Sequence, residues 1–194
     1  MPARLVVVRH GATAWSTAGR HTGTTDLPLE PEGRAQAEAL ALRLAGHAYA
    51  EVLTSPLRRA ADTCALAGFG TRAVVEEGLR EWDYGDYEGR TTDEVRAGRP
   101  GWTIWRDGVP GGETLQEVAA RADEVIARVR ASGGDTLAFA HAHILRVLAA
   151  RWLGLEASAG AHLVLGPAAP CVLGWERETP ALVRWNDTGS GPVP

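Results

Sequence analysis

Near the start of the chain is the segment Leu5-Val6-Val7-Val8-Arg9-His10-Gly11, four apolar residues followed by an arginine, a histidine and a glycine. The run over residues 4–8 is continuous and rich in β-branched side chains, which is typical of a strand buried on both faces in a parallel sheet. Gly11 allows the chain to turn immediately after the strand. The stretch therefore predicts an inner strand with His10 at its carboxyl end.

Strands and helices are expected to alternate along the rest of the chain. Short apolar runs predict strands over residues 51–54, 72–75, 136–140, 171–176 and 182–185. Helical periodicity and capping signals predict helices that begin at Pro31, at Pro56 behind an N-capping Ser55, at the capping box Thr114–Glu117 and at Ile144. This alternation predicts an α/β fold, a three-layer sandwich in which a mainly parallel central sheet carries helices on both faces.

Two segments lack this periodicity. Residues 82–112 are rich in Gly, Trp and Asp, and we expect an inserted lid with one short helix near residues 92–97. Residues 188–194 are rich in Gly, Pro and Ser and predict a flexible tail. The whole of residues 1–187 is then expected to form a single domain.

Composition excludes several classes of protein. The net charge is −4 and no basic stripe is visible, so no nucleic-acid partner is expected. No apolar segment approaches the roughly 20 residues that cross a bilayer, so we expect a cytoplasmic protein without a membrane partner. Cys64 and Cys171 are far apart and indicate neither a disulfide scaffold nor a cysteine zinc site. Seven tryptophans leave a homodimer interface as one open possibility.

Charged and polar residues gather where predicted strands end. His10 and His141 each follow a strand directly, and a third strand ends at Ser55, shortly before Arg58 and Arg59. Functional groups of parallel sheets collect at this edge. We therefore expect two imidazoles and two guanidiniums around one small anion, because a guanidinium binds phosphate oxygens bidentately.

Four segments in this order resemble the motifs of the histidine phosphatase superfamily, which includes the cofactor-dependent phosphoglycerate mutases. The segments are Leu5-Val6-Val7-Val8-Arg9-His10-Gly11-Ala12-Thr13, Ser55-Pro56-Leu57-Arg58-Arg59-Ala60, Leu79-Arg80-Glu81 with the following Gly85 and Glu88-Gly89, and Phe139-Ala140-His141. Together they span nearly the whole chain. The resemblance implies a phosphoglycerate mutase-like fold and a small phosphorylated substrate.

The resemblance also implies a role for each motif residue. His10 would attack phosphorus and form a phosphohistidine, since a neutral imidazole adds no negative charge to a phosphomonoester dianion. Arg9, Arg59 and His141 would stabilise the charge on the equatorial oxygens. Glu81 would protonate the leaving group and later deprotonate water. The backbone N–H groups of Thr22 and Gly23 would hold phosphate, and His21 in the same loop is a further candidate contact. No cofactor and no metal are implied.

The sequence departs from the family pattern at three positions. Ser16 stands where many relatives have Asn, and this shorter donor would loosen one phosphate contact or move it to water. Ala142 replaces the glycine that usually follows the second histidine, where its methyl group would crowd the turn beside the substrate. Glu30 replaces a helix-capping Ser or Thr.

Several residues compete for the implied roles. Arg58 competes with Arg59, and His143 competes with His141. Three acidic residues compete with Glu81, namely Asp83, Asp86 and Glu88.

The pattern over residues 81–89 resembles the phosphatase branch of the family. The segments over residues 15–23, 141–143 and 149–154 resemble a branch that contains sugar-bisphosphatases and broad-specificity acid phosphatases. Arg20, His21 and a lid arginine such as Arg106 would then bind a second phosphate. Three alternatives remain: a phosphoglycerate mutase-type transfer, a binder of phosphorylated ligands without turnover, and a metallohydrolase. The last would place a metal between His10, His141, His143 and a carboxylate.

Overall fold

A six-stranded sheet forms the centre of the computed structural model, which describes residues 2–189 and 191–193. The strands are β1 (Leu5–Arg9), β2 (Glu51–Thr54), β3 (Ala73–Val75), β4 (Thr136–Ala140), β5 (Pro170–Glu176) and β6 (Thr179–Arg184), in the order β3-β2-β4-β1-β5-β6. Neighbours from β3 to β1 are parallel, whereas β5 is antiparallel to both β1 and β6. The mainly parallel sheet is therefore confirmed.

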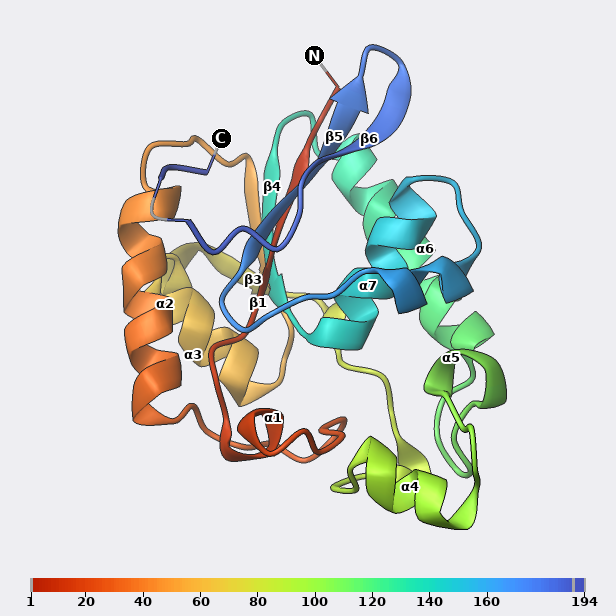
Figure 1. Cartoon of the computed structure of the whole chain (residues 1–194). Helices are drawn as coiled ribbons and strands as arrows, with labels where there is room; N and C mark the ends of the chain where they lie inside the picture. The colour runs from red at the N-terminus through yellow and green to blue at the C-terminus, as the bar shows by residue number, and fades with distance from the viewer. Residues whose placement is uncertain (1, 190, 194) are drawn as a thin grey trace.

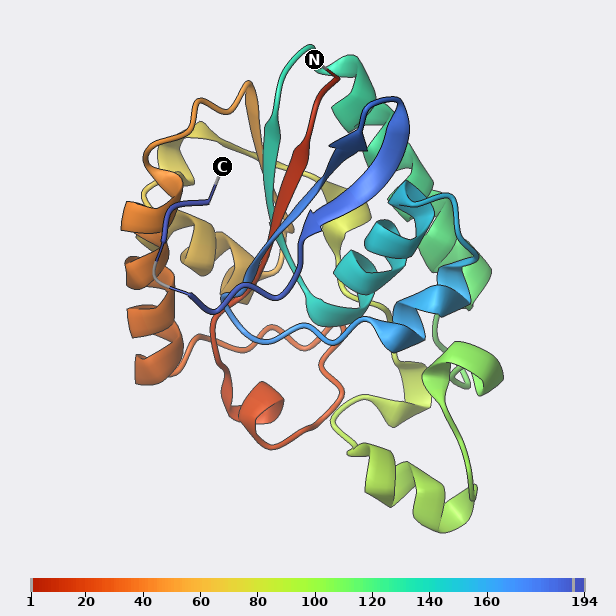
Figure 2. The same ribbon diagram turned by 45° about the horizontal axis from the view of Figure 1, so that its top comes forward.

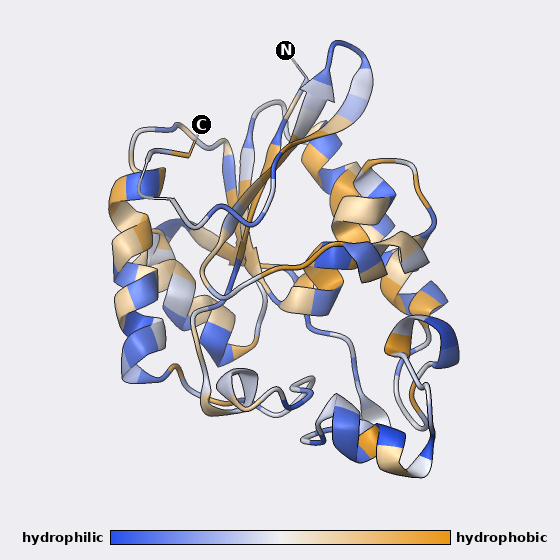
Figure 3. Ribbon diagram, viewed as in Figure 1, coloured by the Kyte–Doolittle hydropathy of each residue, from blue (hydrophilic) through white to orange (hydrophobic). Residues whose placement is uncertain are grey.

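Helices cover both faces of the sheet, as Figures 1 and 2 show. One face carries α2 (Pro31–Leu44) and α3 (Arg58–Leu66), and the other carries α6 (Leu115–Ala131) and α7 (Ala142–Trp152). The side chains of β1 alternate between two cores: Val6 and Val8 pack in the α2/α3 layer, and Leu5 and Val7 in the α6/α7 layer. Figure 3 shows hydrophobic residues along these central strands and on the adjoining helix faces. Burial on both faces explains the unbroken apolar run.

The predicted lid contains two short helices, not one. These are α4 (Thr92–Gly98) and α5 (Ile104–Asp107), and the 3₁₀ turn η3 (Gly85–Tyr87) precedes them. The single turn of α5 is too short to show a period, and it is closed by the Thr103 N–H, which donates to the Asp107 carboxylate at 2.8 Å. Trp82, Tyr84 and Trp102 are buried in the same core as α6 and α7. The remaining short elements are α1 (Ala14–Thr17), η1 (Gly70–Arg72), η2 (Glu77–Leu79) and η4 (Ala157–His162).

The start of α3 differs from the prediction. Its N-cap is Leu57, so the helix begins at Arg58 and Pro56 stands before it. The Ser55 hydroxyl accepts a weak bond from the Leu57 N–H at 3.3 Å and also contacts the His141 ring at 2.7 Å. Ser55 therefore serves the strand-end cluster and does not cap the helix. The Glu30 side chain makes no capping hydrogen bond at the start of α2, which agrees with the expectation that Glu30 replaces a capping Ser or Thr there.

The last residues contact α2. The backbone N–H of Val193 donates to the Arg43 carbonyl at 2.8 Å, and Arg43 Nε donates to the Gly191 carbonyl at 3.0 Å. Val193 is buried. Ser190 and Pro194 of the predicted tail lie outside the described residues. Among the residues that are described, no helix has both the length and the apolar composition needed to cross a bilayer.

Candidate active site

The parallel pairing of β1 and β4 brings the two strand-end histidines together. Arg9 of β1 lies opposite Ala140 of β4, and the His10 N–H donates to the Ala140 carbonyl at 2.9 Å. The rings of His10 and His141 have centroids 5.2 Å apart. The Ser55 N–H donates to the Phe139 carbonyl at 2.9 Å, which places the end of β2 beside them. The predicted cluster at the carboxyl edge of the sheet is therefore present.

The tautomer of His10 follows from one hydrogen bond. Its Nδ1 lies 2.7 Å from the Gly11 carbonyl oxygen, which only accepts, so Nδ1 carries the proton. Nε2 then has the lone pair, and no described residue makes a hydrogen bond with it. Burial, reinforced by the charges of Arg9 and Arg59, holds the pKa of His10 well below 6.5. The ring is neutral at pH 7 and nucleophilic at Nε2.

The tautomer of His141 is opposite to that of His10. Arg59 Nε, which only donates, lies 3.1 Å from Nδ1 of His141. The proton of the neutral ring is therefore on Nε2, which donates to the Ser55 hydroxyl at 2.7 Å. Burial and the adjacent Arg59 charge hold the pKa of His141 well below 6.5. Both ring nitrogens of His141 thus have protein partners.

Arg59 is fully buried and holds the loop that follows α1. Its Nη1 donates to the Thr25 carbonyl at 2.9 Å, and its Nη2 lies 3.0 Å from the carbonyls of both Thr22 and Gly23. By contrast, the side chain of the rival Arg58 is 62% exposed and pairs with Asp62. Of the two arginines in the motif, only Arg59 reaches the cluster.

The backbone N–H of Gly23, predicted to hold phosphate, has a protein partner in the structure. It donates to both carboxylate oxygens of Glu88 at 2.9 Å, and the Thr25 N–H donates to the same carboxylate at 3.1 Å. Glu88, a predicted rival of Glu81, therefore anchors the loop over residues 22–25.

Glu81 lies at the amino end of α7. Its Oε1 accepts hydrogen bonds from the backbone N–H groups of Trp82 and Ile144, each at 3.0 Å, and its Oε2 accepts from the His143 N–H at 3.1 Å. Donors at a helix start fix a carboxyl group in place. Oε2 accepts a single bond, so it keeps a lone pair that can carry a proton.

A cavity of about 270 Å³ joins the cluster to the lid. Seven predicted site residues line it: Arg9, His10, Ser16, His21, Thr22, Glu81 and Ala142. Arg59, His141 and Gly23 are buried and do not line it, but Arg59 donates to the carbonyl of the lining residue Thr22 and the His141 ring lies beside that of His10. Arg9 donates through Nη1 to the Leu165 carbonyl at 2.7 Å, whereas its Nε is buried and has no hydrogen-bond partner among the described residues. Arg9 and His10 line the same cavity, and a charged donor without a partner there suits an anion.

The Ser16 hydroxyl, predicted to contact phosphate, makes its hydrogen bonds with the backbone of Thr13. It accepts from the Thr13 N–H at 2.9 Å and donates to the Thr13 carbonyl at 3.0 Å, which completes a capping box for α1. Ser16 thus lines the cavity while its hydroxyl is bound to Thr13.

The cavity lining also contains residues that the sequence analysis did not single out. Arg146 is one of them, with its guanidinium 4.6 Å from the Trp105 ring and bonded to the carbonyls of Gly160 and Ala161. The Tyr84 hydroxyl lies 2.6 Å from His143 Nδ1. By contrast, Arg106, the lid arginine proposed for a second phosphate, lies outside this cavity and pairs with Asp107. Arg20 and His21 do line it.

No group of three His, Cys, Asp or Glu side chains within residues 2–189 and 191–193 is arranged to hold a metal. The metallohydrolase alternative also requires a free lone pair on His141. That lone pair accepts the Arg59 Nε–H.

Comparison with known proteins agrees with this geometry. The family model of the histidine phosphatase superfamily (branch 1) matches residues 5–188. An acid phosphatase of Mycobacterium tuberculosis is 40% identical, covering 96% of this chain and 93% of that protein. Sedoheptulose 1,7-bisphosphatase of Saccharomyces cerevisiae is 37% identical, covering 78% and 68%.

A solved structure of a Mycobacterium tuberculosis open reading frame superposes with a TM-score of 0.89 at 38% identity, covering 95% of this chain and 97% of that one. The six-stranded sheet thus has the phosphoglycerate mutase-like arrangement that the sequence motifs imply. The chain belongs to branch 1 of the histidine phosphatase superfamily and is a phosphatase of that family.

Proposed function

We propose that this protein hydrolyses phosphomonoesters of small metabolites through a phosphohistidine at His10, without a metal ion. The observation that carries the proposal is the His10 tautomer: Nδ1–H is bound to the Gly11 carbonyl and Nε2 is free. The ring shares one cavity with Arg9 and Glu81. Nucleophile, cationic donor and proton carrier are therefore next to one another.

The reaction proceeds in two steps. In the first, Nε2 of His10 bonds to phosphorus, the bond from phosphorus to the ester oxygen breaks, and protonated Glu81 gives its proton to the departing alkoxide. In the second, the Glu81 carboxylate takes a proton from water, the oxygen of that water bonds to phosphorus, and His10 leaves as neutral imidazole. Glu81 regains its proton, so one water is consumed and one alcohol and one phosphate are released.

Positive donors surround the transferring group. Arg9 offers its unpaired Nε to an equatorial oxygen. Arg59 exchanges a loop carbonyl for a phosphate oxygen, and the neutral His141 contributes as an uncharged donor whose Nε2–H exchanges the Ser55 hydroxyl for a phosphate oxygen. Preorganised donors of this kind supply most of the catalysis in phosphoryl transfer. Thr22 and Ala142 border the same space and limit its size.

Three basic residues of the cavity lining suit a leaving group with a second phosphate. These are Arg146, Arg20 and His21, and the Nε2 atom of His21 is buried with no hydrogen-bond partner among the described residues. A sugar bisphosphate fits these groups, with one phosphate at His10 and the other at Arg146. The yeast relative is named for a substrate of that class.

The main test is a hydrolysis screen in the presence of EDTA, with p-nitrophenyl phosphate, sugar monophosphates, sugar bisphosphates and 3-phosphoglycerate as substrates. We expect EDTA-resistant phosphate release that is lost in His10→Ala. Mild acid should release the trapped phosphate from denatured wild-type enzyme, because phosphoimidazole is acid-labile. Release that persists in His10→Ala, or that stops with EDTA, would refute the mechanism.

The second phosphate is tested with Arg146→Met and, as a matched control, Arg106→Met. We expect Arg146→Met to lower kcat/KM for a sugar bisphosphate at least about tenfold more than for the corresponding monophosphate, the loss of one charged contact. Arg106→Met should change neither value, because Arg106 lies outside the cavity. Equal losses on both substrates would contradict the bisphosphate assignment.

A further inference from the structure

Glu81 lies in the connection between the 3₁₀ turns η2 and η3, which contains no strand and no α-helix. This segment, residues 78–83, runs from the last part of η2 to just before η3, and we call it the Glu81 strap. The carboxyl group is fixed from one side by the amino end of α7. Within the strap only the N–H groups of Leu79 and Arg80 have local backbone partners, the carbonyls of Glu76 and Glu77, so its carbonyl groups must find donors elsewhere in the molecule.

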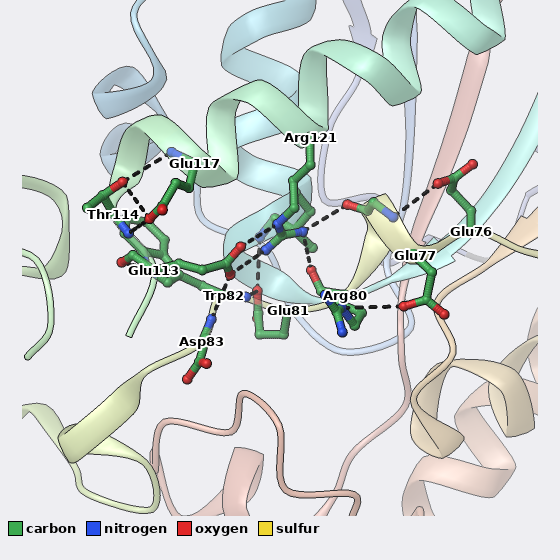
Figure 4. Close-up of polar contacts among 12 residues, drawn as sticks. Glu76, Glu77, Arg80, Glu81, Trp82, Asp83, Glu113, Thr114, Glu117 and Arg121 are labelled. Carbon is green, nitrogen blue, oxygen red and sulfur yellow. Dashed lines mark hydrogen bonds and ion pairs between the residues drawn. The ribbon is translucent and has the colours of Figure 1, made fainter. Parts of the chain in front are cut away.

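Arg121 of α6 supplies those partners. As Figure 4 shows, its Nη1 donates to the carbonyl of Gly78 at 2.8 Å and to that of Arg80 at 2.6 Å. Arg80 directly precedes Glu81. The Arg121 side chain is only 13% exposed; its bond to Gly78 is partly buried and its bond to Arg80 lies at the surface. One guanidinium therefore holds two strap carbonyls on the amino-terminal side of Glu81.

Glu113 holds the other side of the strap. Its carboxylate pairs bidentately with Arg121, with Nε to Oε1 at 2.9 Å and Nη2 to Oε2 at 3.0 Å. The same Oε2 accepts the Asp83 N–H at 2.9 Å, and the Glu113 carbonyl accepts the Trp82 indole N–H at 2.8 Å. Arg121 and Glu113 together thus contact the residues on both sides of Glu81 (Figure 4).

The helix that carries Arg121 is a rigid base. Val118, Ala122 and Val125 of α6 are fully or almost fully buried in the core. The strap lies directly on this helix, because a Cβ on Gly78 would be 2.8 Å from Val125 Cγ2. Motion of the strap relative to α6 is therefore opposed both by packing and by the bonds to Arg121.

We propose that Arg121 and Glu113 are positioning residues for Glu81: they hold the strap so that the Glu81 carboxyl group meets the leaving-group oxygen. This inference rests on the proposed role of Glu81 in proton transfer. Neither residue lines the cavity, so neither contacts the substrate. A displacement of about 1 Å in a reacting group costs on the order of 10²-fold in rate, which sets the size of the effect.

The test compares two substrates that differ in their need for an acid. p-Nitrophenolate leaves readily without a proton, whereas the alkoxide of glycerol 1-phosphate requires one. Because kcat/KM reports the steps up to formation of the phosphohistidine, the ratio of kcat/KM for the alkyl substrate to that for the aryl substrate measures the acid alone. We expect Glu81→Gln to lower this ratio by about 10²-fold or more. Arg121→Met should lower it by about tenfold or more while activity on p-nitrophenyl phosphate is largely retained.

Arg151→Met is the matched control. Arg151 pairs bidentately with Asp123 of α6, at 2.9 and 3.0 Å, and lies away from the strap. Its loss should leave the ratio within about twofold of wild type, as expected for an ion pair with a structural role only. If Arg121→Met does not fold, Glu113→Gln gives the same test with a side chain of equal size, and the ratio should fall severalfold.

The outcomes separate the two proposals. A ratio that falls in Glu81→Gln but stays at the wild-type value in Arg121→Met and Glu113→Gln would overturn the positioning role and leave the proposed function intact. A ratio unchanged in Glu81→Gln would overturn the acid role of Glu81 itself. Arg121→Lys keeps the charge but not the planar fork, so it should leave the ratio low. Full recovery of the ratio in Arg121→Lys would refute the geometric argument.

Discussion

Replacing Arg59 with methionine should damage both stability and catalysis, whereas the same change at Arg58 should do neither. Methionine matches the aliphatic part of arginine and has no guanidinium, so it removes the donors and keeps the packing of the stem. Arg59 is fully buried and donates to His141 Nδ1 and to three loop carbonyls. The Arg58 side chain is 62% exposed and forms an i,i+4 pair with Asp62 at 3.1 Å.

The size of the stability effect follows from these bonds. A hydrogen bond from a charged donor contributes about 1.5–3 kcal/mol, so four bonds at the low end give about 6 kcal/mol. Two gains oppose this loss: the loop carbonyls regain water when the loop opens, and the desolvation cost of a buried guanidinium disappears. We therefore expect a net fall of about 3 kcal/mol in the free energy of unfolding for Arg59→Met. For Arg58→Met we expect less than about 0.5 kcal/mol.

The catalytic effect should be larger. If Arg59 stabilises the phosphoryl group in the transition state, its loss should lower kcat by about 10³-fold or more, as for other arginines in this role. Urea unfolding followed by tryptophan fluorescence gives the stability, and p-nitrophenyl phosphate and a sugar phosphate give the rates. A kcat within tenfold of wild type would refute the phosphate role, and a stability loss below about 1 kcal/mol would refute the loop contacts. Equal losses of stability and kcat in Arg58→Met would refute the assignment of these roles to Arg59 and not to Arg58.

For two further perturbations, a change of pH and a substitution at Gly33, the structure gives the direction of the effect on stability. The pKa values of His10, His141 and His143 are all held well below 6.5, mainly by burial, so unfolding takes up protons at acidic pH. Their contribution to stability is complete above the unfolded pKa of about 6.5 and is lost as the pH falls below it, by at most about 1.4 kcal/mol per pH unit for each ring. Urea unfolding from pH 7 to 5 should show this slope, and His143→Phe should reduce it; an unchanged slope would contradict the burial argument. Gly33→Ala should lower stability by about 1–3 kcal/mol and kcat/KM by tenfold, because the added methyl group would lie 2.1 Å from the Ala12 carbonyl oxygen in the loop after His10. Gly46→Ala, where nothing lies within 4 Å of the new methyl group, is the control, and equal stability of the two variants would rule out the steric argument.

The sheet and the strand-end cluster were predictable because they depend on local signals and one general rule. A continuous apolar run predicts an inner strand, and parallel strands present their carboxyl ends at one edge. Together these two facts predict that His10 and His141 lie close to one another, and the centroids of the two rings are 5.2 Å apart. The α3 start was not predictable in the same way. Ser55-Pro56 is a good helix-start signal, but the Ser55 hydroxyl is used by His141, a partner 86 positions away in the sequence.

The lid side of the cavity was harder to predict because its segments have no period that fixes their direction. Arg106 and Arg146 look equally available in the sequence, yet only Arg146 lines the cavity. One signal distinguishes them. Arg146 lies in the second turn of α7, whose start directly follows the strand end at His141, whereas Arg106 belongs to an isolated turn in the lid. Distance along a helix from a strand end was therefore the better guide to position than membership of the lid.

The arginine-rich composition was a weaker guide still. The chain has 20 arginines and no lysine, and only Arg9, Arg20 and Arg146 line the cavity. Most of the others bind carboxylates or backbone carbonyls, as Arg121 does beneath the Glu81 strap. The fork that suits a phosphate also suits a carboxylate and a pair of peptide carbonyls. An arginine in this sequence therefore does not by itself indicate a phosphate site, and a place in the cavity lining, as at Arg9 with its unpaired Nε, is the better guide.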